Sequence, residues 1–348
     1  MKPVVVIADD RTGAMETAGA CADLGCGAIV VPFGVTSALD SQCVVLDLAT
    51  RHLSPSEAQA RAVSAPAHAL HKIDSTLRGA WAHEIVGRQQ AHSIRVVVAP
   101  AFPAAGRTCE DGVVMIDGVP VADGEAATDV RGPVRSSRPA DHLRKAGADA
   151  VDEVTPKGLL RWIRRSRGQI AVCDARTDVD LVIIASLCGV SEGVVLAGTA
   201  RAIGYRASEA IGPGALLPGR PSCDPPALVV CGILHPMALA QAAAAEAAGI
   251  TVLRPPSSAV DDAGAIAAAL GGAAREAIES GRFATVIVVG GDTAAAALGD
   301  RAVVVGGTLG PGVAWSRAWG DDGPLLLTKP GGFGTPSTIV DVVGGARP

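Results

Sequence analysis

The chain has 348 residues, enough for two domains, and 49% of them are hydrophobic, so each domain can bury a core. The net charge of −5, the single Tyr and the four Phe exclude the clustered basic and aromatic surface of a nucleic-acid-binding protein. The eight cysteines form no CxxC pair, so we expect reduced thiols in packed cores rather than a zinc site or disulfides.

The first predicted element, PVVVIADD, reads as a buried strand rather than a signal peptide. Further along, glycine, proline and charged residues interrupt every apolar run before it reaches membrane-spanning length. We therefore expect a cytoplasmic protein with no membrane partner.

Apolar strands alternate with alanine-rich helices through the first half of the chain. The predicted strands cover residues 4–8, 28–33, 43–48, 95–99, 170–173, 181–184 and 193–197. The predicted helices cover residues 14–24, a segment capped by Ser54, and residues 81–90. Polar residues gather where the strands end, which is where open α/β sheets bind ligands. Residues 122–140 are polar and predict a loop or excursion.

Residues 212–226 hold five prolines and three glycines and are the best linker candidate. After them the alternation resumes, with strands predicted at 227–231, 251–253 and 285–289 and helices at 236–248 and 261–280. We predict an α/β protein of two domains, residues 1–221 and 222–348. Each domain is expected to be a largely parallel sheet flanked by helices, with the active site in the cleft between them.

Two adjacent acids, Asp9 and Asp10, follow the first predicted strand and precede a helix. Asp10 alone would be explained as a helix cap. The second acid needs another reason, and carboxylates at a strand end can bind substrate hydroxyls or act as a general base. We therefore predict a functional role for the pair.

The segment HKIDSTLRG places a cation, an acid, hydroxyls and an arginine in one strand-to-helix turn, through Lys72, Asp74, Ser75 and Arg78. Arginine can hold a carboxylate by two parallel hydrogen bonds, which suits an acidic substrate. A capped helix with a solvated arginine is the plainer interpretation, but it does not explain this density. Arg107, in the loop after another strand, is a candidate second anion clamp.

Glycine-rich turns dominate the second half and suggest a phosphate cradle. One is a turn between a strand and a helix, which can offer backbone N–H groups to phosphate oxygens. Each glycine pair alone could be an ordinary turn, and neither a GxxxxGK[ST] loop nor a GxGxxG fingerprint at the first strand of either half is present. The candidate nucleotide contacts are Gly290, Gly291, Asp292, Thr293, Gly310, Gly331, Gly332 and, as a lone histidine after a strand, His235.

Together these segments resemble the four-carbon acid sugar kinase family, the ATP-dependent kinases of erythronate, threonate and 3-oxo-tetronate. The resemblance runs almost end to end and is carried by IADDRTGA, KIDSTLRG, APAFPAAGRT with DGVPV, GGDT and KPGGFG. It implies an N-terminal domain that binds the sugar acid and a C-terminal domain that binds ATP with Mg²⁺. The chain departs from the family at Arg11, where Leu is common, at Glu16, where Asp is usual, and at 231–236, where a serine-rich stretch is expected.

The hypothesis from these residues is an ATP-dependent kinase of a four-carbon sugar acid. Asp9, Asp10 and Asp74 are assigned the catalytic role, and Lys72, Ser75, Arg78 and Arg107 the binding of the acid. A homodimer is a further hypothesis. Two other functions stay open: an NAD-dependent oxidoreductase of a hydroxy acid, and a non-catalytic sugar-acid-binding regulator.

Overall fold

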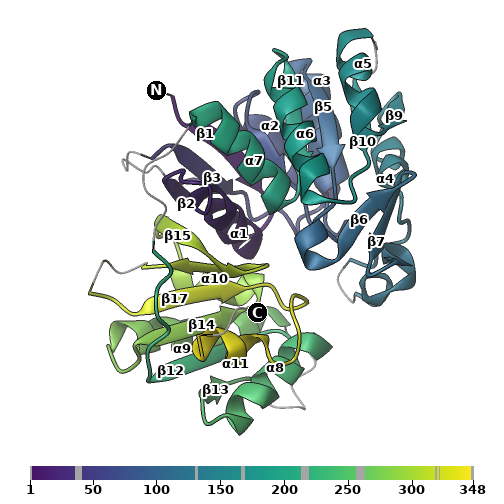
Figure 1. Ribbon diagram of the computed structural model, residues 1–348. Helices are drawn as coiled ribbons and strands as arrows, with labels where there is room; N and C mark the ends of the chain where they lie inside the picture. Colours follow the sequence, from purple (N-terminus) through teal and green to yellow (C-terminus); the bar gives the residue numbers. More distant parts are fainter. Residues whose placement is uncertain are drawn as a thin grey trace.

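The computed structural model describes residues 2–35, 41–129, 132–165, 169–212, 219–255, 263–317, 320 and 322–345. Within these residues fourteen strands form one continuous sheet, and three more form a small separate sheet. Figure 1 shows the N-terminal half, purple to teal, packed edge to edge with the C-terminal half, green to yellow. The α/β class with a largely parallel sheet in each half is confirmed. None of the described helices is long and apolar enough to cross a membrane.

The N-terminal half contains eight parallel strands in the order β2-β3-β1-β4-β11-β5-β10-β9. These strands are β1 (Val4–Ala8), β2 (Ala28–Pro32), β3 (Cys43–Asp47), β4 (Leu70–Lys72), β5 (Arg95–Ala99), β9 (Val151–Val154), β10 (Ile170–Cys173) and β11 (Val194–Gly198). The helices are α1 (Arg11–Ala22), α2 (Pro55–Ser64), α3 (Trp81–His92), α4 (Pro139–Lys145), α5 (Pro156–Arg165), α6 (Asp178–Gly189) and α7 (Ala200–Ile211). Strands β2 and β3 lie on one side of β1, and β4, β11 and β5 lie on its other side. The connections between strands therefore change direction at β1. Such a topological switch point is the usual place for a ligand.

An antiparallel excursion follows β5. It consists of β6 (Arg107–Glu110), β7 (Val113–Ile116) and β8 (Val119–Pro120), with 3₁₀ turns at Pro103–Ala105, Val121–Asp123 and Glu125–Thr128. The polar segment predicted at 122–140 thus contains two of these turns and the start of α4. Its residues 130 and 131 lie outside the described residues.

The C-terminal half continues the sheet in the order β13-β12-β14-β17-β16-β15. Its strands are β12 (Ala227–Cys231), β13 (Thr251–Leu253), β14 (Thr285–Val289), β15 (Val303–Gly310), β16 (Val313–Ser316) and β17 (Leu325–Lys329). Its helices are α8 (Pro236–Ala247), α9 (Ala263–Glu279), α10 (Gly291–Leu298) and α11 (Thr338–Val343). Strands β12, β14 and β17 are neighbouring and parallel, so the loops that follow them meet at one edge.

The two halves are joined because β15 pairs antiparallel with β2, for example Val303 with Val30. Asp23, at the end of α1, adds a side-chain link: its carboxylate accepts hydrogen bonds from the backbone N–H and the hydroxyl of Thr308, at 2.9 and 2.5 Å. One buried apolar cluster also runs through both halves, from Val6 in β1 to Leu326 in β17. The sheets therefore form one structural unit rather than two separate ones.

Helix α1 lies between the two halves, packed against α7 on one side and β15 on the other (Figure 1). Every one of its residues is buried, and most of them are small. A helix with no polar face is expected where protein surrounds it. Gly19 allows the closest approach, since a Cβ atom there would lie 2.9 Å from the backbone oxygen of Gly307 in β15.

One local prediction is wrong. Residues 181–184 belong to helix α6 rather than to a strand, because Thr177 and Asp180 form a capping box and the buried Leu181, Ile184, Ala185 and Cys188 follow the helical period. Gly306 and Gly307 lie inside strand β15, against the ring of Trp315. The eight cysteines lie in buried positions, as predicted. Residues 213–218 of the predicted linker at 212–226 lie outside the described residues.

Candidate functional site

The turn between β1 and α1 places Asp9 and Asp10 at the carboxyl end of a central strand. Asp10 caps α1, because its Oδ1 accepts a hydrogen bond from the Gly13 N–H at 2.8 Å, and Thr12 Oγ1 donates to Oδ2 at 2.8 Å. The capping explanation is therefore correct for Asp10 but does not cover Asp9. Asp9 is almost completely buried.

Arg51 connects the acids of this site, and it was not among the predicted site residues. Its Nε and Nη2 donate to the two oxygens of Asp9 at 2.7 and 2.9 Å, and its Nη1 donates to Asp10 Oδ2 at 2.8 Å. Asp74 Oδ1 lies 3.5 Å from Nη2. Arg51 comes from the turn after β3, where Ala49 adopts φ = +50°, a conformation in which a residue with a side chain is strained. That turn brings the guanidinium among three carboxylates.

The predicted Lys72–Arg78 segment forms the neighbouring wall, after β4. Arg78 donates from Nε and Nη2 to the two oxygens of Asp74, at 3.0 and 3.2 Å, and from Nη1 to Asp129 at 3.3 Å. Leu77 has φ = +62°, so this turn is also held in an unusual backbone conformation. Lys72 and Ser75 are buried, and Lys72 Nζ donates to the Ile73 carbonyl at 2.8 Å.

Arg107 and Glu16 supply buried groups with unused hydrogen-bonding capacity. Among the described residues, Arg107 Nε and Glu16 Oε1 are buried and have no hydrogen-bond partner. Such orphaned groups are rare in folded proteins and need an explanation, which a ligand would provide. The guanidinium of Arg107 stacks on the ring of Phe333, 4.0 Å from its centroid, and its Nη1 donates to the Ala105 carbonyl. Phe333 belongs to the KPGGFG loop of the other half.

The glycine loops of the C-terminal half converge after β12, β14 and β17. The Gly290 N–H donates to the Lys329 carbonyl at 2.9 Å, and the Gly232 N–H donates to the Val289 carbonyl at 3.1 Å. A Cβ atom on Gly332 would lie 3.1 Å from His235 Nε2, so His235 borders the KPGGFG loop. Gly290 has φ = +111°, which favours glycine there. The glycine loops that follow these three strands thus lie close to one another.

The predicted nucleotide residues differ in how close they lie to the place where the loops after β12, β14 and β17 meet. Gly290 to Thr293 form the N-terminal turn of α10, and Gly331 and Gly332 lie beside His235. Gly310 ends β15 at a hairpin turn, whose Gly312 lies against Phe333, because a Cβ atom there would be 3.0 Å from the ring. His235 caps α8 through Nδ1, which accepts from the Met237 N–H at 3.2 Å.

The acid cluster and the glycine loops are in direct contact. A Cβ atom on Gly291 would lie 2.6 Å from Asp10 Oδ2 and 3.3 Å from Thr12 Oγ1. Nearby, His52 Nε2 lies 3.4 Å from Asp292 Oδ1, and His235 Nε2 lies 3.2 Å from Glu125 Oε2. These contacts bring residues predicted for two different ligands to one boundary between the halves.

Burial and charge act in opposite directions on the acids. Burial raises the pKa of Asp9 to about 6, although Arg51 opposes the shift. Burial also acts to raise the pKa of Asp74, but the charges of Arg78 and Arg51 outweigh it and hold that pKa well below its ordinary value. Burial raises the pKa of Glu16, against the charges of Lys72 and Arg107. Perturbed groups gathered at one strand edge are typical of a functional site.

Lys329 ends β17 at the start of the KPGGFG loop and is almost fully buried. Its Nζ donates to the Pro330 carbonyl at 2.7 Å, and burial lowers its pKa to about 7. A cation beside a glycine-rich turn can bind a phosphate group. The sequence prediction named only the glycines of this loop as nucleotide contacts. The signal that it missed was the same for Lys329 and Arg51: both are cations at or just after the end of a buried strand.

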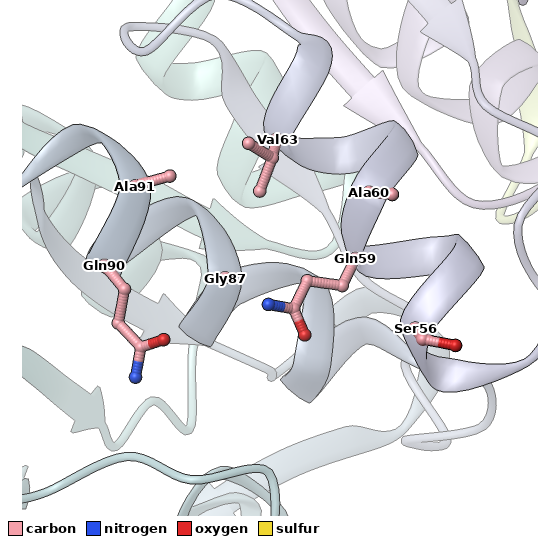
Figure 2. Close-up of a pocket in the computed structure, with 7 residues that line it drawn as sticks. All are labelled: Ser56, Gln59, Ala60, Val63, Gly87, Gln90 and Ala91. Atoms are coloured by element: carbon pink, nitrogen blue, oxygen red, sulfur yellow. The ribbon is translucent and has the colours of Figure 1, made fainter.

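A separate hollow lies between helices α2 and α3. Its volume is about 610 Å³, and its lining comes from α2 and α3 alone, including Gln59 and Gly87. Figure 2 shows Gln59 reaching from α2 towards Gly87 on α3, with Gln90 and Ser56 at the edges. None of the strand-end residues described above lines this hollow, so it is not part of the candidate site.

Two family models match the chain. Residues 4–203 match a sugar-binding N-terminal domain, and residues 235–339 match a nucleotide-binding C-terminal domain. A D-threonate kinase of Bordetella bronchiseptica is 32% identical over 266 residues, which cover 72% of this chain and 64% of that protein. A D-threonate kinase of Cupriavidus necator is also 32% identical, over 52% of this chain and 48% of the relative. The chain thus spans about half to two thirds of the length of these relatives.

Other similar proteins cover nearly the whole chain or all of it. A 3-oxo-tetronate kinase of Methylobacterium radiotolerans is 27% identical over 94% of this chain and 95% of its own. A solved Haemophilus influenzae protein covers 98% of the chain with a TM-score of 0.71 at 16% identity, which shows the shared fold. A Bordetella bronchiseptica structure, a domain-swapped dimer with bound citrate, is 26% identical with a TM-score of 0.53 and covers 100% of this chain and 99% of its own. The chain belongs to the four-carbon acid sugar kinase family.

Proposed function

We propose that this protein is an ATP-dependent kinase that phosphorylates a hydroxyl group of a four-carbon sugar acid. The observation that carries the proposal is the contact between Gly291 and Asp10. It joins the helix N-terminus expected to face phosphate with a carboxylate expected to face a hydroxyl. Phosphoryl transfer requires mainly that two reactants be held in line and that charge be neutralised. An acid cluster that borders a glycine-rich turn is suited to both requirements.

Arg107 and Arg78 are proposed to bind the substrate carboxylate. Arg107 has an unpaired, buried Nε, and Arg78, whose charge is close enough to act on Arg107, has its guanidinium on Asp74 and Asp129. Lys72 adds a buried positive charge near Glu16. The Bordetella relative with bound citrate supports an acid-binding role for this fold. Glu16, with its free buried oxygen, is proposed to accept a hydrogen bond from a substrate hydroxyl.

Asp10 is the acid that we propose as the general base. Both oxygens of Asp9 accept hydrogen bonds from Arg51, and Asp74 is held by Arg78. Asp10 Oδ2 also accepts hydrogen bonds from Arg51 and Thr12, but what distinguishes Asp10 is that it borders Gly291, where the phosphoryl group would arrive. In this assignment Asp10 accepts the proton of the attacking hydroxyl. Asp9 and Arg51 orient Asp10, and Asp74 orients Arg78.

The turn Gly290–Thr293 and the loop from Gly331 to Gly332 are proposed to hold the ATP phosphates through backbone N–H groups, with Lys329 and His235 beside them. No three His, Cys, Asp or Glu side chains are grouped as a metal site in the described parts of the chain. Mg²⁺ bound with a nucleotide takes most of its ligands from phosphate and water, so one carboxylate beside the phosphates fits it. Asp292, the carboxylate of the Gly290–Thr293 turn, would hold the ion, which would neutralise phosphate charge.

The division into a sugar-acid domain, residues 1–221, and a nucleotide domain, residues 222–348, is part of the proposal. The two matched family regions support it, since one ends before residue 221 and the other starts after residue 222. The domain-swapped dimer formed by the Bordetella relative supports a dimer for this chain.

The proposal is tested by measuring ADP release with D-threonate, D-erythronate and 3-oxo-tetronate, each with ATP and Mg²⁺. We expect turnover with at least one acid. Asp10→Asn should lower kcat by about 10²- to 10⁴-fold, the usual contribution of a positioned general base. Acid binding, measured by calorimetry, should persist in this variant.

The same preparation distinguishes the other functions. An NAD-dependent oxidoreductase would bind NADH, which a fluorescence titration detects, and would not release ADP. A regulator would bind an acid without turning it over. Acid binding with no ADP release from any of the acids would refute the kinase.

A further inference from the structure

Helix α10 contacts two consecutive residues of the β1–α1 turn, one at each of its ends. At its N-terminus, Gly291 lies against Asp10. At its C-terminus, Arg11 donates from Nη1 and Nη2 to the Gly299 carbonyl, at 3.3 and 3.2 Å. Asp10 and Arg11 belong to the N-terminal half, while α10 belongs to the other. The helix that presents the Gly290–Thr293 turn is therefore attached to the opposite half at both ends.

Arg11 is itself fixed on the N-terminal half. Its Nε donates to Asp47 Oδ2 at 2.7 Å, and both side chains are almost fully buried, at 4% and 3% exposed. Asp47 Oδ1 accepts from the Ala49 N–H at 3.0 Å, in the turn that leads to Arg51. A guanidinium held by charged hydrogen bonds in a buried site has one geometry. Arg11 thus links the turn that carries Arg51 to the far end of α10.

We propose that Arg11 is a positioning residue for phosphoryl transfer: it fixes α10 so that the Gly290–Thr293 turn stays aligned with Asp10. The catalytic consequence rests on the kinase function proposed above. The pairing of β2 with β15 joins the halves along one line of strands, with Asp23 and Thr308 at the same seam. Strand pairing along one line leaves rotation of one half against the other, as in hinge motions, to be limited by contacts elsewhere. Arg11 supplies one of these contacts, in addition to the stacking of Arg107 on Phe333 and the His52–Asp292 and His235–Glu125 pairs.

The same end of α10 provides a matched comparison. Arg275, in α9, donates from Nε to the Ala297 carbonyl at 3.0 Å and from Nη2 to the Ala296 carbonyl at 2.6 Å. Both arginines satisfy carbonyls at the C-terminal end of the helix and complement its dipole. Arg275, however, lies in the same half as α10. Losing Arg275 weakens the end of the helix, whereas losing Arg11 also removes a link between the halves.

The test compares Arg11→Leu with Arg275→Leu. Misplacing reacting groups by about 1 Å costs on the order of 10²-fold in rate, so we expect Arg11→Leu to lower kcat about 10- to 100-fold. The dissociation constant of ATP should change by less than about threefold, because the glycine loops remain intact. Arg275→Leu should lower the melting temperature while kcat stays within about twofold. Arg11→Lys keeps the positive charge but loses the paired N–H donors of the guanidinium. Its kcat should lie between those of the unchanged protein and Arg11→Leu.

A second measurement does not depend on activity. Hydrogen exchange should speed up about tenfold in Arg11→Leu, both at α10 and at the β2–β15 pairing. In Arg275→Leu it should speed up only in the C-terminal half. If the proposed kinase function fails, this measurement alone decides the role of Arg11. Exchange changes confined to α10 in both variants, or an unchanged kcat in Arg11→Leu and Arg11→Lys, would overturn the proposal.

Discussion

The two halves of the candidate site differ in the chemical groups that form them. On the N-terminal side, charged side chains hold one another: Arg51 binds Asp9 and Asp10, and Arg78 binds Asp74. On the C-terminal side, backbone and glycine dominate, and the turn at Gly290–Thr293 approaches Asp10 because no side chain stands at Gly291. The N-terminal region therefore depends on its charged side chains, and the C-terminal region depends on the absence of a side chain at its glycines.

This difference determines how each region can be damaged. Removing one partner from a buried ion cluster leaves charges that are neither solvated nor paired, which costs much more than the pair contributes. A glycine turn has no charged side chain to lose, but it does not tolerate an added methyl group. The place that a Cβ atom would take is already filled by a neighbouring residue. The N-terminal region should therefore be sensitive to deletion, and the C-terminal region to addition. The predictions below test that contrast, from the largest expected effect to the smallest.

Arg51→Ala should be the most damaging change. It leaves the Asp9 and Asp10 carboxylates without their shared cation and Asp74 without a second one. We expect a loss of about 3 kcal/mol in the free energy of unfolding, measured in urea, and a loss of roughly 10³-fold or more in kcat/KM. Arg51→Lys should stay folded but regain little activity, because an ammonium cannot form the paired hydrogen bonds.

Arg254→Ala is the control, since Arg254 makes an exposed ion pair with Glu246 in the other half. Exposed pairs contribute about 0–1 kcal/mol, so both stability and activity should hardly change. Full activity in Arg51→Lys would contradict the contrast, because a charge alone would then suffice in the acid cluster.

Gly291→Ala tests the other side of the boundary. The new methyl group would meet Asp10 Oδ2, which Arg51 and Thr12 hold in place, so either the acid or the turn must move. We expect kcat to fall by about 10²-fold with a small change in unfolding free energy.

Gly272→Ala provides the matched control in the same half, because a Cβ atom on Gly272, in helix α9, meets nothing within 4 Å. That change should leave activity intact and stabilise the protein by about 0.5–1 kcal/mol, the helix-propensity difference. Equal kinetics in the two glycine variants would show that the turn does not need to approach Asp10.

Arg78→Ala should raise KM for the sugar acid about 10- to 100-fold, the loss of one charged hydrogen-bonding group. The dissociation constant of ATP should remain within about twofold. Arg138→Ala is the comparison, since its ion pair with Glu153 lies in the same half, away from the strand-end cluster. Weaker ATP binding in Arg78→Ala, with acid binding preserved, would reverse the assignment of the two halves.

The pH dependence of stability should have opposite signs in the two regions. The pKa of Asp9 is raised from 3.8 to about 6, so between these values the folded state binds the extra proton and stability falls as the pH rises. The pKa of Lys329 is lowered from 10.5 to about 7, so above pH 7 the unfolded state binds the extra proton and stability rises with pH. Each slope approaches about 1.4 kcal/mol per pH unit.

Urea unfolding at a series of pH values measures both slopes. Asp9→Asn should flatten the curve between about pH 4 and 6, and Lys329→Met should flatten it between about pH 7 and 10. A slope that persists unchanged in the matching variant would assign it to another group.

The elements that could be predicted from sequence are those whose signals are local. The run Val4–Ala8 and the cap Asp10 lie where the apolar pattern and capping rules put them. The grouping of acids and arginines could also be predicted, because parallel strands end at the same edge of a sheet and these residues follow the strand ends. The failure at 181–184 was also local, because the capping box at Thr177 was overlooked beside a β-branched apolar run.

Long-range pairings could not be predicted from sequence. Nothing near Arg51 indicates that its turn places it on Asp9, and nothing near Arg11 indicates Gly299 as its partner. The continuous sheet is a further case, since β15 reads as glycine-rich and loop-like until β2 supplies an edge. Such features depend on tertiary contacts that override local propensity.

The pairing of β2 with β15 also has a consequence during synthesis on the ribosome. Strand β2 is complete early, whereas its partner emerges only near the end of the chain. At about 5–20 residues per second, the nascent N-terminal half waits on the order of tens of seconds with an apolar strand uncovered. Another nascent chain can pair with such an edge. A supply of chaperones during synthesis should therefore raise the yield of this protein.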